Sequence, residues 1–373
     1  ISNAEKKSVI DVVNSGWLSN AGKYVKLFEK KISKINKSKF TVSLINGTSA
    51  LNISLKIIGV KYNDEVIVPT VTFIAPVNAV LYHGAKPIFM DCDNYLNIDV
   101  DKAIQFIDEE TIFKNGYSYN KNTRNRVLAI IVVHVFGNLC NLSKLKNICK
   151  KKNIKIIEDA SEALGSRYIS GKLKGKHAGT VGDLGCLSFN INKIVTSGGG
   201  GAILTNNKKD YLKIKKIINQ SKLNSFYFIH DELGYNLGLS NIQASIGYTQ
   251  LNKFRSILKN KRKIFSIYSN KLKTNSDYQI LKSPNYCFSN RWLNIVKIVD
   301  KKIKREELFI KFNNQNIEVR PLWQLGHLQN YLKKYQSYKI QNANKIVNKI
   351  LCLPSSYFLT EKQITKVTKC LEK

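Results

Sequence analysis

Short hydrophobic runs alternate with helical periodicity along residues 40–205. Six short runs are strand candidates, and most of them are apolar on both faces, which is typical of buried parallel strands. They cover residues 66–68, 87–90, 127–133, 155–157, 184–189 and 201–204. Apolar residues at helical spacing are found at 48–58, 75–83 and 142–152. This alternation predicts a doubly wound α/β domain, with a mostly parallel sheet between helices.

A second pattern begins after Ser240. Apolar residues at helical spacing continue into a lysine-rich stretch that ends near Leu272, and they predict one long connecting helix. The tail beyond it mixes strand and helix patterns. We therefore expect a large domain at 1–250 and a smaller α+β domain at 251–373.

Composition narrows the class of protein. The 373 residues are 43% hydrophobic, which is enough for a substantial core, and the longest apolar run is far shorter than the roughly 20 residues of a membrane-spanning helix. The seven cysteines form no C-x-x-C motif and the five histidines are isolated, so the sequence indicates neither a disulfide framework nor a metal site. We expect a cytoplasmic protein without a membrane partner, whose cysteines are reduced and mostly buried.

The formal net charge of +34 favours polyanionic partners. Nucleic acid is one candidate, but the lysines are spread along the whole chain and form no focused patch with interleaved aromatic residues. A solvated basic surface is the simpler interpretation. We expect no nucleic-acid partner, and we expect the charge to suit an anionic substrate such as a nucleotide diphosphate.

The first chemical signal is the run Asn46-Gly47-Thr48-Ser49, at the start of a predicted helix. A tight turn, two hydroxyls and free backbone N–H groups at a helix N-terminus form a cradle for phosphate. Taken alone, the same run favours an ordinary Ser/Thr helix cap.

Two carboxylates, Glu158 and Asp159, end a predicted buried strand. Catalytic side chains of α/β folds lie at the carboxyl ends of parallel strands, and a carboxylate placed there can keep a pyridinium nitrogen protonated. A strand-end aspartate that caps the next helix is the alternative.

Lys193 follows Ser188 by five residues and precedes the glycine run 198–201. Glycines let the backbone pass close to a bulky ligand. A single lysine means little in a chain with so many. The order is informative, because a phosphate turn, a strand-end acid and Ser-x-x-x-x-Lys with glycines occur within one α/β domain.

Together these motifs resemble the fold type I sugar aminotransferases of the DegT/StrS family, most closely their LegC-like branch. The resemblance covers nearly the whole chain. It is carried by residues 15–19, 28–29, 46–51, 68–75, 158–166, 188–193, 234–236 and 243–244. It implies a large pyridoxal-phosphate-binding domain with a mostly parallel seven-stranded sheet between helices, and a smaller C-terminal α+β domain.

The resemblance also implies a role for each matching residue. Lys193 is the expected Schiff-base lysine and proton carrier, and Asp159 is the expected partner of the pyridinium nitrogen of pyridoxal 5'-phosphate. Phe73 is expected to stack on the cofactor ring, and Glu162 to lie near its phenolic oxygen or the substrate amine. The expected binding residues around the cofactor phosphate are Gly47, Thr48, Ser49, Ser188 and Asn236. Asn236 would reach across from the partner subunit, so we expect a homodimer with shared active sites.

Three further residues match the segments of the family that face the sugar nucleotide: Trp17, Arg320 and His327. A surface salt bridge is the alternative for Arg320, and a structural imidazole for His327.

The expected reaction transfers an amino group from L-glutamate to the 4-keto group of a nucleotide-linked 6-deoxy sugar. In the LegC-like branch this is a UDP-linked 2-acetamido-4-keto-hexose, for surface-glycan synthesis. One alternative is a pyridoxamine-phosphate-dependent sugar dehydratase of the same fold, but its histidine replaces the lysine found here as Lys193. The other is a non-enzymatic basic regulator or nucleic-acid binder, which would have no reason to retain Lys193, Asp159 and the phosphate turn together.

Overall fold

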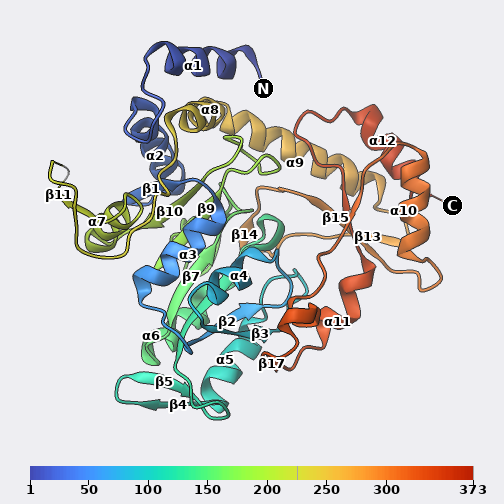
Figure 1. Cartoon of the computed structure of the whole chain (residues 1–373). Helices are drawn as coiled ribbons and strands as arrows, with labels where there is room; N and C mark the ends of the chain where they lie inside the picture. The colour runs from blue at the N-terminus through green and yellow to red at the C-terminus, as the bar shows by residue number, and fades with distance from the viewer. Residues whose placement is uncertain (225, 373) are drawn as a thin grey trace.

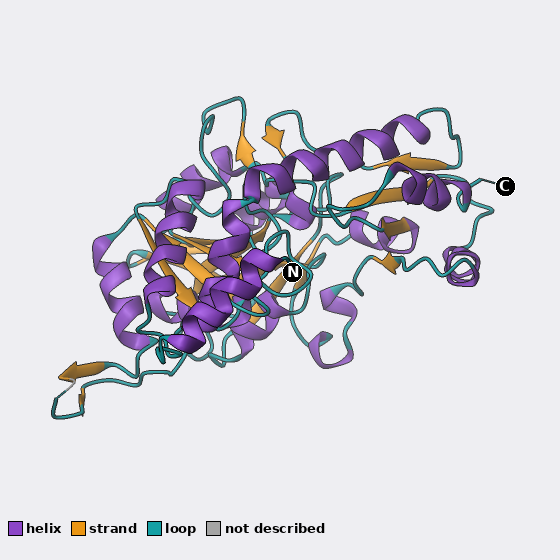
Figure 2. Cartoon of the chain, turned by 90° about the horizontal axis from the view of Figure 1, so that it is seen from above, coloured by secondary structure: helices purple, strands orange, loops and turns teal. Residues whose placement is uncertain are grey.

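The computed structural model of the chain describes residues 1–224 and 226–372. A large sheet forms the centre of the protein, and helices lie on both sides of it (Figure 1, Figure 2). The C-terminal third forms a separate layer of helices and strands beside this sheet (Figure 1).

The central sheet has eight strands in the order β1-β10-β9-β7-β6-β2-β3-β17. These are β1 Phe40–Leu44, β2 Glu65–Pro69, β3 Lys86–Met90, β6 Val127–Val133, β7 Lys155–Asp159, β9 Leu184–Ser188, β10 Gly201–Thr205 and β17 Ser337–Tyr338. The strands from β9 to β17 run parallel, while β10 is antiparallel to both of its neighbours. The six predicted strands are all present, and the mostly parallel sheet is confirmed. It has one strand more than expected, because β17 from the C-terminal part pairs with the end of β3.

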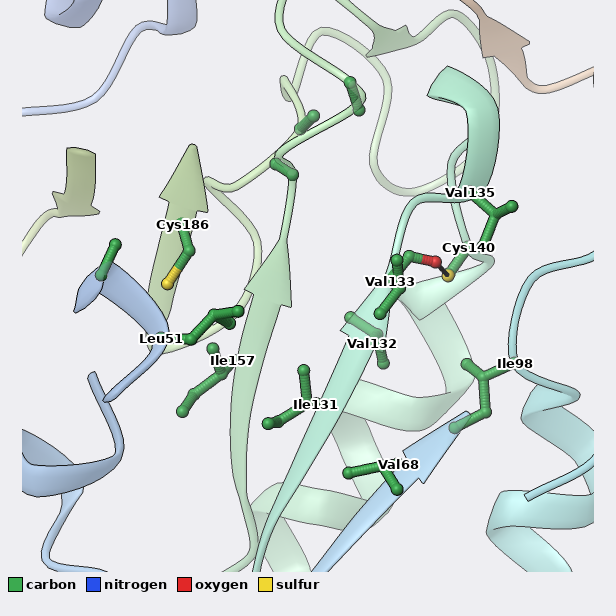
Figure 3. Close-up of a cluster of buried hydrophobic side chains, with 14 of the residues drawn as sticks. Leu51, Val68, Ile98, Ile131, Val132, Val133, Val135, Cys140, Ile157 and Cys186 are labelled. Carbon is green, nitrogen blue, oxygen red and sulfur yellow. Dashed lines mark hydrogen bonds between the residues drawn. The ribbon is translucent and has the colours of Figure 1, made fainter. Parts of the chain in front are cut away.

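The helices of the N-terminal part are α1 Asn3–Asn14, α2 Lys23–Asn36, α3 Gly47–Ile58, α4 Ala75–Leu81, α5 Val100–Glu109, α6 Leu142–Lys151 and α7 Lys208–Ile217. Helix α3 packs against β7, β9 and β10. Its Leu51 points into the same apolar interior as Ile131, Ile157 and Cys186 of the strands (Figure 3). This packing fixes the N-terminus of α3 next to the carboxyl ends of β7 and β9.

The predicted long helix is two helices, α8 Asn241–Asn252 and α9 Phe254–Lys271. They meet at Lys253, whose Nζ lies 3.1 Å from an oxygen of the buried Glu5 of α1. The expectation of one unbroken helix is therefore wrong. A tertiary contact lies at the break, and such a contact cannot be predicted from the spacing of apolar residues.

A second hydrophobic cluster forms the C-terminal layer. It contains Tyr268, Val296, Phe312 and Leu351, and its first member along the chain is Ile264 of α9. The strands of its sheet are β13 Tyr278–Ile280, β15 Asn294–Ile298, β18 Ile350–Leu353 and β16 Arg320–Pro321, and its helices include α10 Arg305–Asn314 and α12 Glu361–Lys369. Helix α11 Asn342–Ile346 packs its buried residues into the main cluster instead. The proposed domain boundary at 250/251 stays a prediction.

Three short ribbons complete the strands: β4 Thr111–Lys114 with β5 Tyr117–Asn120, β8 Arg167–Tyr168 with β14 Cys287–Phe288, and β11 Lys222–Asn224 with β12 Ile229–His230. All seven cysteines are buried free thiols, as expected. Within residues 1–224 and 226–372, no helix combines the length and the apolar character needed to cross a membrane.

Candidate active site

A cavity of about 400 Å³ lies at the carboxyl ends of β7 and β9, beside the N-terminus of α3. Its lining includes these predicted cofactor residues: Gly47, Thr48, Phe73, Asp159, Glu162, Ser188 and Lys193. Two tryptophans from the C-terminal half of the chain, Trp292 and Trp323, add to its wall. The fold thus brings together groups that are far apart in the sequence.

Lys193 projects into this cavity from the loop after β9. Its Nζ lies 3.5 Å from Oε1 of Glu162 and 4.1 Å from the centre of the Trp292 ring. Only 12% of the lysine side chain is exposed. The amine is thus held between a carboxylate and an aromatic face, in a site largely shielded from water.

Glu162 is a buried carboxyl group beside the lysine. Its Oε2 accepts a hydrogen bond from the backbone N–H of Phe136 at 2.8 Å. Burial raises the pKa of Glu162 to about 7, although Lys193 and the Phe136 N–H favour its charged form. The group is therefore poised to change its protonation state near neutral pH.

Glu158 and Asp159 point in opposite directions, as neighbouring residues of a strand must. Glu158 is fully buried, accepts hydrogen bonds from the backbone N–H groups of Gly179, Val181 and Gly182, and bonds His134. Asp159 faces the cavity, and its Oδ1 accepts from the N–H of Ser161 at 3.0 Å. Glu158 therefore has a structural role, which leaves Asp159 available to a ligand.

The start of α3 has the geometry of a phosphate cradle. The side chain of Asn46 caps the helix by accepting from the N–H of Ser49 at 2.7 Å, and the first turn contains no acidic residue. A Cβ at Gly47 would lie 2.9 Å from Cβ of Ser188, so only glycine leaves this space open. The buried Oγ1 of Thr72, also in the wall, has no hydrogen-bond partner among the described residues. A phosphate-bearing cofactor fits this cradle.

Five predicted site residues do not line the cavity within this chain: Ser49, Trp17, Asn236, Arg320 and His327. Trp17 is 64% exposed beside a different small pocket, and Asn236 is exposed in the segment that follows β12. Arg320 pairs with Glu318, and Nδ1 of His327 lies 2.7 Å from Oγ1 of Thr70. Their roles stay predictions.

Sequence reasoning missed Trp292. Trp323 belongs to the run Arg320-Pro321-Leu322-Trp323, which resembles the family's segment that faces the sugar nucleotide, but it was not singled out as a site residue. Both rings stack near Phe136, at centroid distances of 6.1 and 5.1 Å. No motif marks Trp292, which the C-terminal layer brings to the cavity from a distant part of the chain. Asn46 lies in the predicted phosphate turn, but the sequence alone does not predict that its side chain caps the helix.

Residues 1–372 match the model of the DegT/DnrJ/EryC1/StrS aminotransferase family. The chain belongs to this family. It is 34% identical over 369 residues to the GDP-perosamine synthase of Escherichia coli O157:H7, covering 98% of this chain and 94% of the relative. It is 32% identical over 338 residues to the UDP-4-amino-4,6-dideoxy-N-acetyl-beta-L-altrosamine transaminase of Campylobacter jejuni subsp. jejuni serotype O:23/36, covering 89% of this chain and 85% of the relative.

Solved structures show the same fold. A DegT DnrJ EryC1 StrS aminotransferase from Brucella abortus has a TM-score of 0.89 at 24% identity, covering 99% of this chain and 94% of that one. An Escherichia coli GDP-4-keto-6-deoxy-D-mannose-3-dehydratase with bound hydrated PLP has a TM-score of 0.85 at 22% identity, covering 100% and 97%. The fold is therefore shared by transaminases and dehydratases.

Membership of this family confirms the expected fold type I architecture and the class of enzyme, a sugar-nucleotide transaminase. The family is dependent on pyridoxal phosphate. Assignment to the LegC-like branch stays a prediction.

Proposed function

We propose that this chain binds pyridoxal 5'-phosphate and transfers an amino group from L-glutamate to the 4-keto group of a nucleotide-linked 6-deoxy sugar. The observation that carries the proposal is the position of Lys193, whose amine lies in the cavity with Asp159 and next to Glu162. The proposed working unit is a homodimer with shared active sites, and the product would enter surface-glycan synthesis.

The predicted cofactor residues that line the cavity each have a part in this proposal. Gly47, Thr48 and Ser188 would bind the cofactor phosphate at the positive end of the α3 dipole. Asp159 would keep the ring nitrogen protonated, and Phe73 would stack on the ring. When bound, pyridoxal phosphate supplies the electron sink that lets nitrogen be taken from one substrate and given to another.

Lys193 and Glu162 would handle the protons. The Nζ of Lys193 would hold the cofactor by a covalent link in the resting enzyme and, as the free amine once that link is exchanged for the substrate amine, would carry a proton between cofactor and substrate carbon. Glu162, with its raised pKa, would hold or release a proton beside that amine. Trp292 lies over the amine of Lys193 and would help to orient it.

A dehydratase is the second candidate, because one of the solved structures with this fold is a dehydratase. The lysine argues against it, since sugar dehydratases of this fold are expected to carry histidine at the position of Lys193. A non-enzymatic basic binder is disfavoured as well, because it would not need an amine, an acid and a phosphate cradle around one cavity.

The nucleotide to which the sugar substrate is linked is a separate part of the proposal. The resemblance to the LegC-like branch implies a UDP-linked 2-acetamido-4-keto-hexose, and the relative from Campylobacter jejuni is named for a UDP sugar. The relative from Escherichia coli O157:H7 is named for a GDP sugar. We retain the UDP-linked sugar as the proposal and take the GDP-linked 4-keto sugar as its direct competitor.

An assay against UDP-, GDP- and dTDP-linked 4-keto sugars, with L-glutamate as donor, tests the function. We expect stoichiometric loss of glutamate and gain of an amino sugar, with kcat/KM highest for the UDP compound. If kcat/KM is highest with the GDP sugar, the proposed nucleotide is wrong but the proposed transaminase activity stands. Deoxygenation of the sugar without net transfer of nitrogen would indicate a dehydratase. The purified protein should also show an absorbance band near the visible edge that sodium borohydride removes.

A further inference from the structure

Three arginines outside the lining of the cofactor cavity come from β8 (Arg167), from α9 (Arg262) and from the segment after β14 (Arg291), and β8 pairs with β14. The Cζ of Arg167 lies 3.9 Å, and that of Arg262 4.1 Å, from the centre of the Phe288 ring. These two guanidinium groups are therefore no farther apart than the sum of the two distances. The third arginine, Arg291, lies 3.5 Å from the ring centre of Phe265, one turn beyond Arg262 on α9.

None of the three guanidinium groups pairs with a carboxylate in the described part of the chain, where the arginine ion pairs are those of Arg126, Arg305 and Arg320. Their polar contacts are neutral. Arg291 donates to Oγ of Ser283 at 2.9 Å, and Arg262 donates to the carbonyl of Ser289 at 3.4 Å. The cluster therefore concentrates positive charge without a counter-charge from its own chain.

The charges also disturb one another. Burial, followed by repulsion from Arg262, lowers the pKa of Arg291 to about 10, and burial with repulsion from Arg167 lowers the pKa of Arg262. Burial, with Lys37 and Arg167 nearby, lowers the pKa of His177 to about 4. A bound anion would relieve this repulsion.

Two buried nitrogen atoms of this region have no hydrogen-bond partner among the described residues: Nε of Arg291 and Nδ1 of His177. The backbone of His177 is bridged to that of Arg167, and Arg291 contacts Phe265, one turn beyond Arg262 on α9. Buried polar atoms without a partner are uncommon in folded proteins. They are an independent sign that this region has unused capacity for hydrogen bonds.

We propose that Arg167, Arg262 and Arg291 form a binding site for a small phosphate-bearing anion, separate from the cofactor cavity. Guanidinium groups bind phosphate through parallel N–H···O bonds, and the aromatic rings beneath them hold their planes in place. A carboxylate from a second copy of the chain is a poorer occupant, because the chain has 26 acidic residues against 60 basic ones. The site lies one residue from the active-site wall, since Trp292 follows Arg291.

Isothermal titration of the cofactor-loaded enzyme with inorganic pyrophosphate at low ionic strength tests the proposal. Loading with cofactor fills the phosphate cradle of α3 beforehand. The variants are Arg262→Gln and Arg167→Gln, and the matched control is Lys263→Gln, which removes one charge from the exposed neighbour of Arg262 on α9. We expect wild type and control to bind alike, and each arginine variant to bind about tenfold more weakly or worse.

Three results would overturn the proposal: no binding by wild type, an equal loss in all three variants, or no loss in either arginine variant. An equal loss would indicate diffuse attraction, and no loss would indicate binding in the substrate cavity. If Arg167→Gln fails to fold, the exposed Arg262 decides alone. Arg262→Lys keeps the charge without the planar fork, so its affinity should lie between those of wild type and Arg262→Gln.

Discussion

The amine of Lys193 lies 4.1 Å from the centre of the Trp292 ring. The indole Nε1 of Trp292 donates to the carbonyl of Asn192 at 2.8 Å, so the tryptophan also holds the backbone next to the lysine. Cation–π attraction of this kind contributes about 0.5–2 kcal/mol. A residue of the C-terminal half of the chain therefore helps to fix the direction in which the central amine points.

Replacing Lys193 by alanine should abolish transamination and remove the borohydride-sensitive absorbance band. Among the described residues Lys193 is the lysine that lines the cavity, so no other amine of that part of the chain is placed to attach to the cofactor. The fold should remain intact, which circular dichroism and thermal melting can check. Lys174→Ala, at an exposed loop position, is the matched control and should keep full activity. Full turnover by Lys193→Ala would falsify the assignment.

Asp159→Asn and Glu158→Gln should affect different properties, although the two residues are neighbours: the first should lower activity and the second should lower stability. Asp159→Asn should keep the fold and some bound cofactor but lose most activity, because an amide does not hold the ring nitrogen protonated. Glu158→Gln should reduce the free energy of unfolding by about 3 kcal/mol or more, because it weakens charge-assisted bonds to buried N–H groups. Rate measurements and denaturant melts of both variants check the contrast. Near wild-type rates in Asp159→Asn would assign the role to another residue.

Much of the fold could be predicted because its strands have a strong sequence pattern. Strand β6 is buried at every position and is apolar throughout, which is the pattern of a parallel strand covered on both faces. The pairing of β17 could not be predicted in the same way. It has two residues, too few for any periodicity, and its position depends on how the C-terminal layer packs.

The residues of the candidate site differ in the same way: some could be predicted from local sequence patterns, and others depend on tertiary packing. Gly47, Asp159 and Lys193 lie next to strands or helix ends, so local patterns and the family resemblance both pointed to them. Trp292 could not be found that way, because its contact with Lys193 joins positions about a hundred residues apart and depends on tertiary packing. For Asn236 the situation is reversed. The family resemblance implies that it binds the cofactor phosphate, but it does not line the cavity of its own chain.

The titration of Glu162 should be visible in the pH dependence of stability of the cofactor-free protein. Its folded pKa of about 7 is above the ordinary value of 4.5. Between these values the folded state binds more protons than the unfolded state, so the free energy of unfolding contributed by this group falls as pH rises. The Glu162→Gln variant has no titratable group at this position. The free energy of unfolding of the variant, relative to that of wild type, should therefore be higher at pH 8 than at pH 5. Denaturant melts at both pH values measure this, and parallel profiles for the two proteins would contradict it.

Asn236 should act on the active site of a second chain. The residue is exposed, it lies in the segment after β12, and the cavity of its own chain does not include it. If it binds the cofactor phosphate of a partner, Asn236→Ala should lose about 1.5–3 kcal/mol of cofactor binding, the range for a hydrogen bond to a charged group. Dilution should then release cofactor from Asn236→Ala before it does so from wild type.

Complementation gives the sharper test, because it separates a shared site from a purely structural defect. Each mixed dimer of Lys193→Ala with Asn236→Ala chains has one site in which both Lys193 and Asn236 are intact, and one site in which both are lost. Mixing the two impaired proteins should therefore restore part of the activity, up to about half of the sites in each mixed dimer. Mixing Lys193→Ala with Asp159→Asn is the control and should restore none, because both residues are contributed by the same chain and every mixed site then lacks one of them. Failure of the Asn236 pair to recover, with mixed dimers present and Asn236→Ala severely impaired alone, would place Asn236 outside the partner's active site.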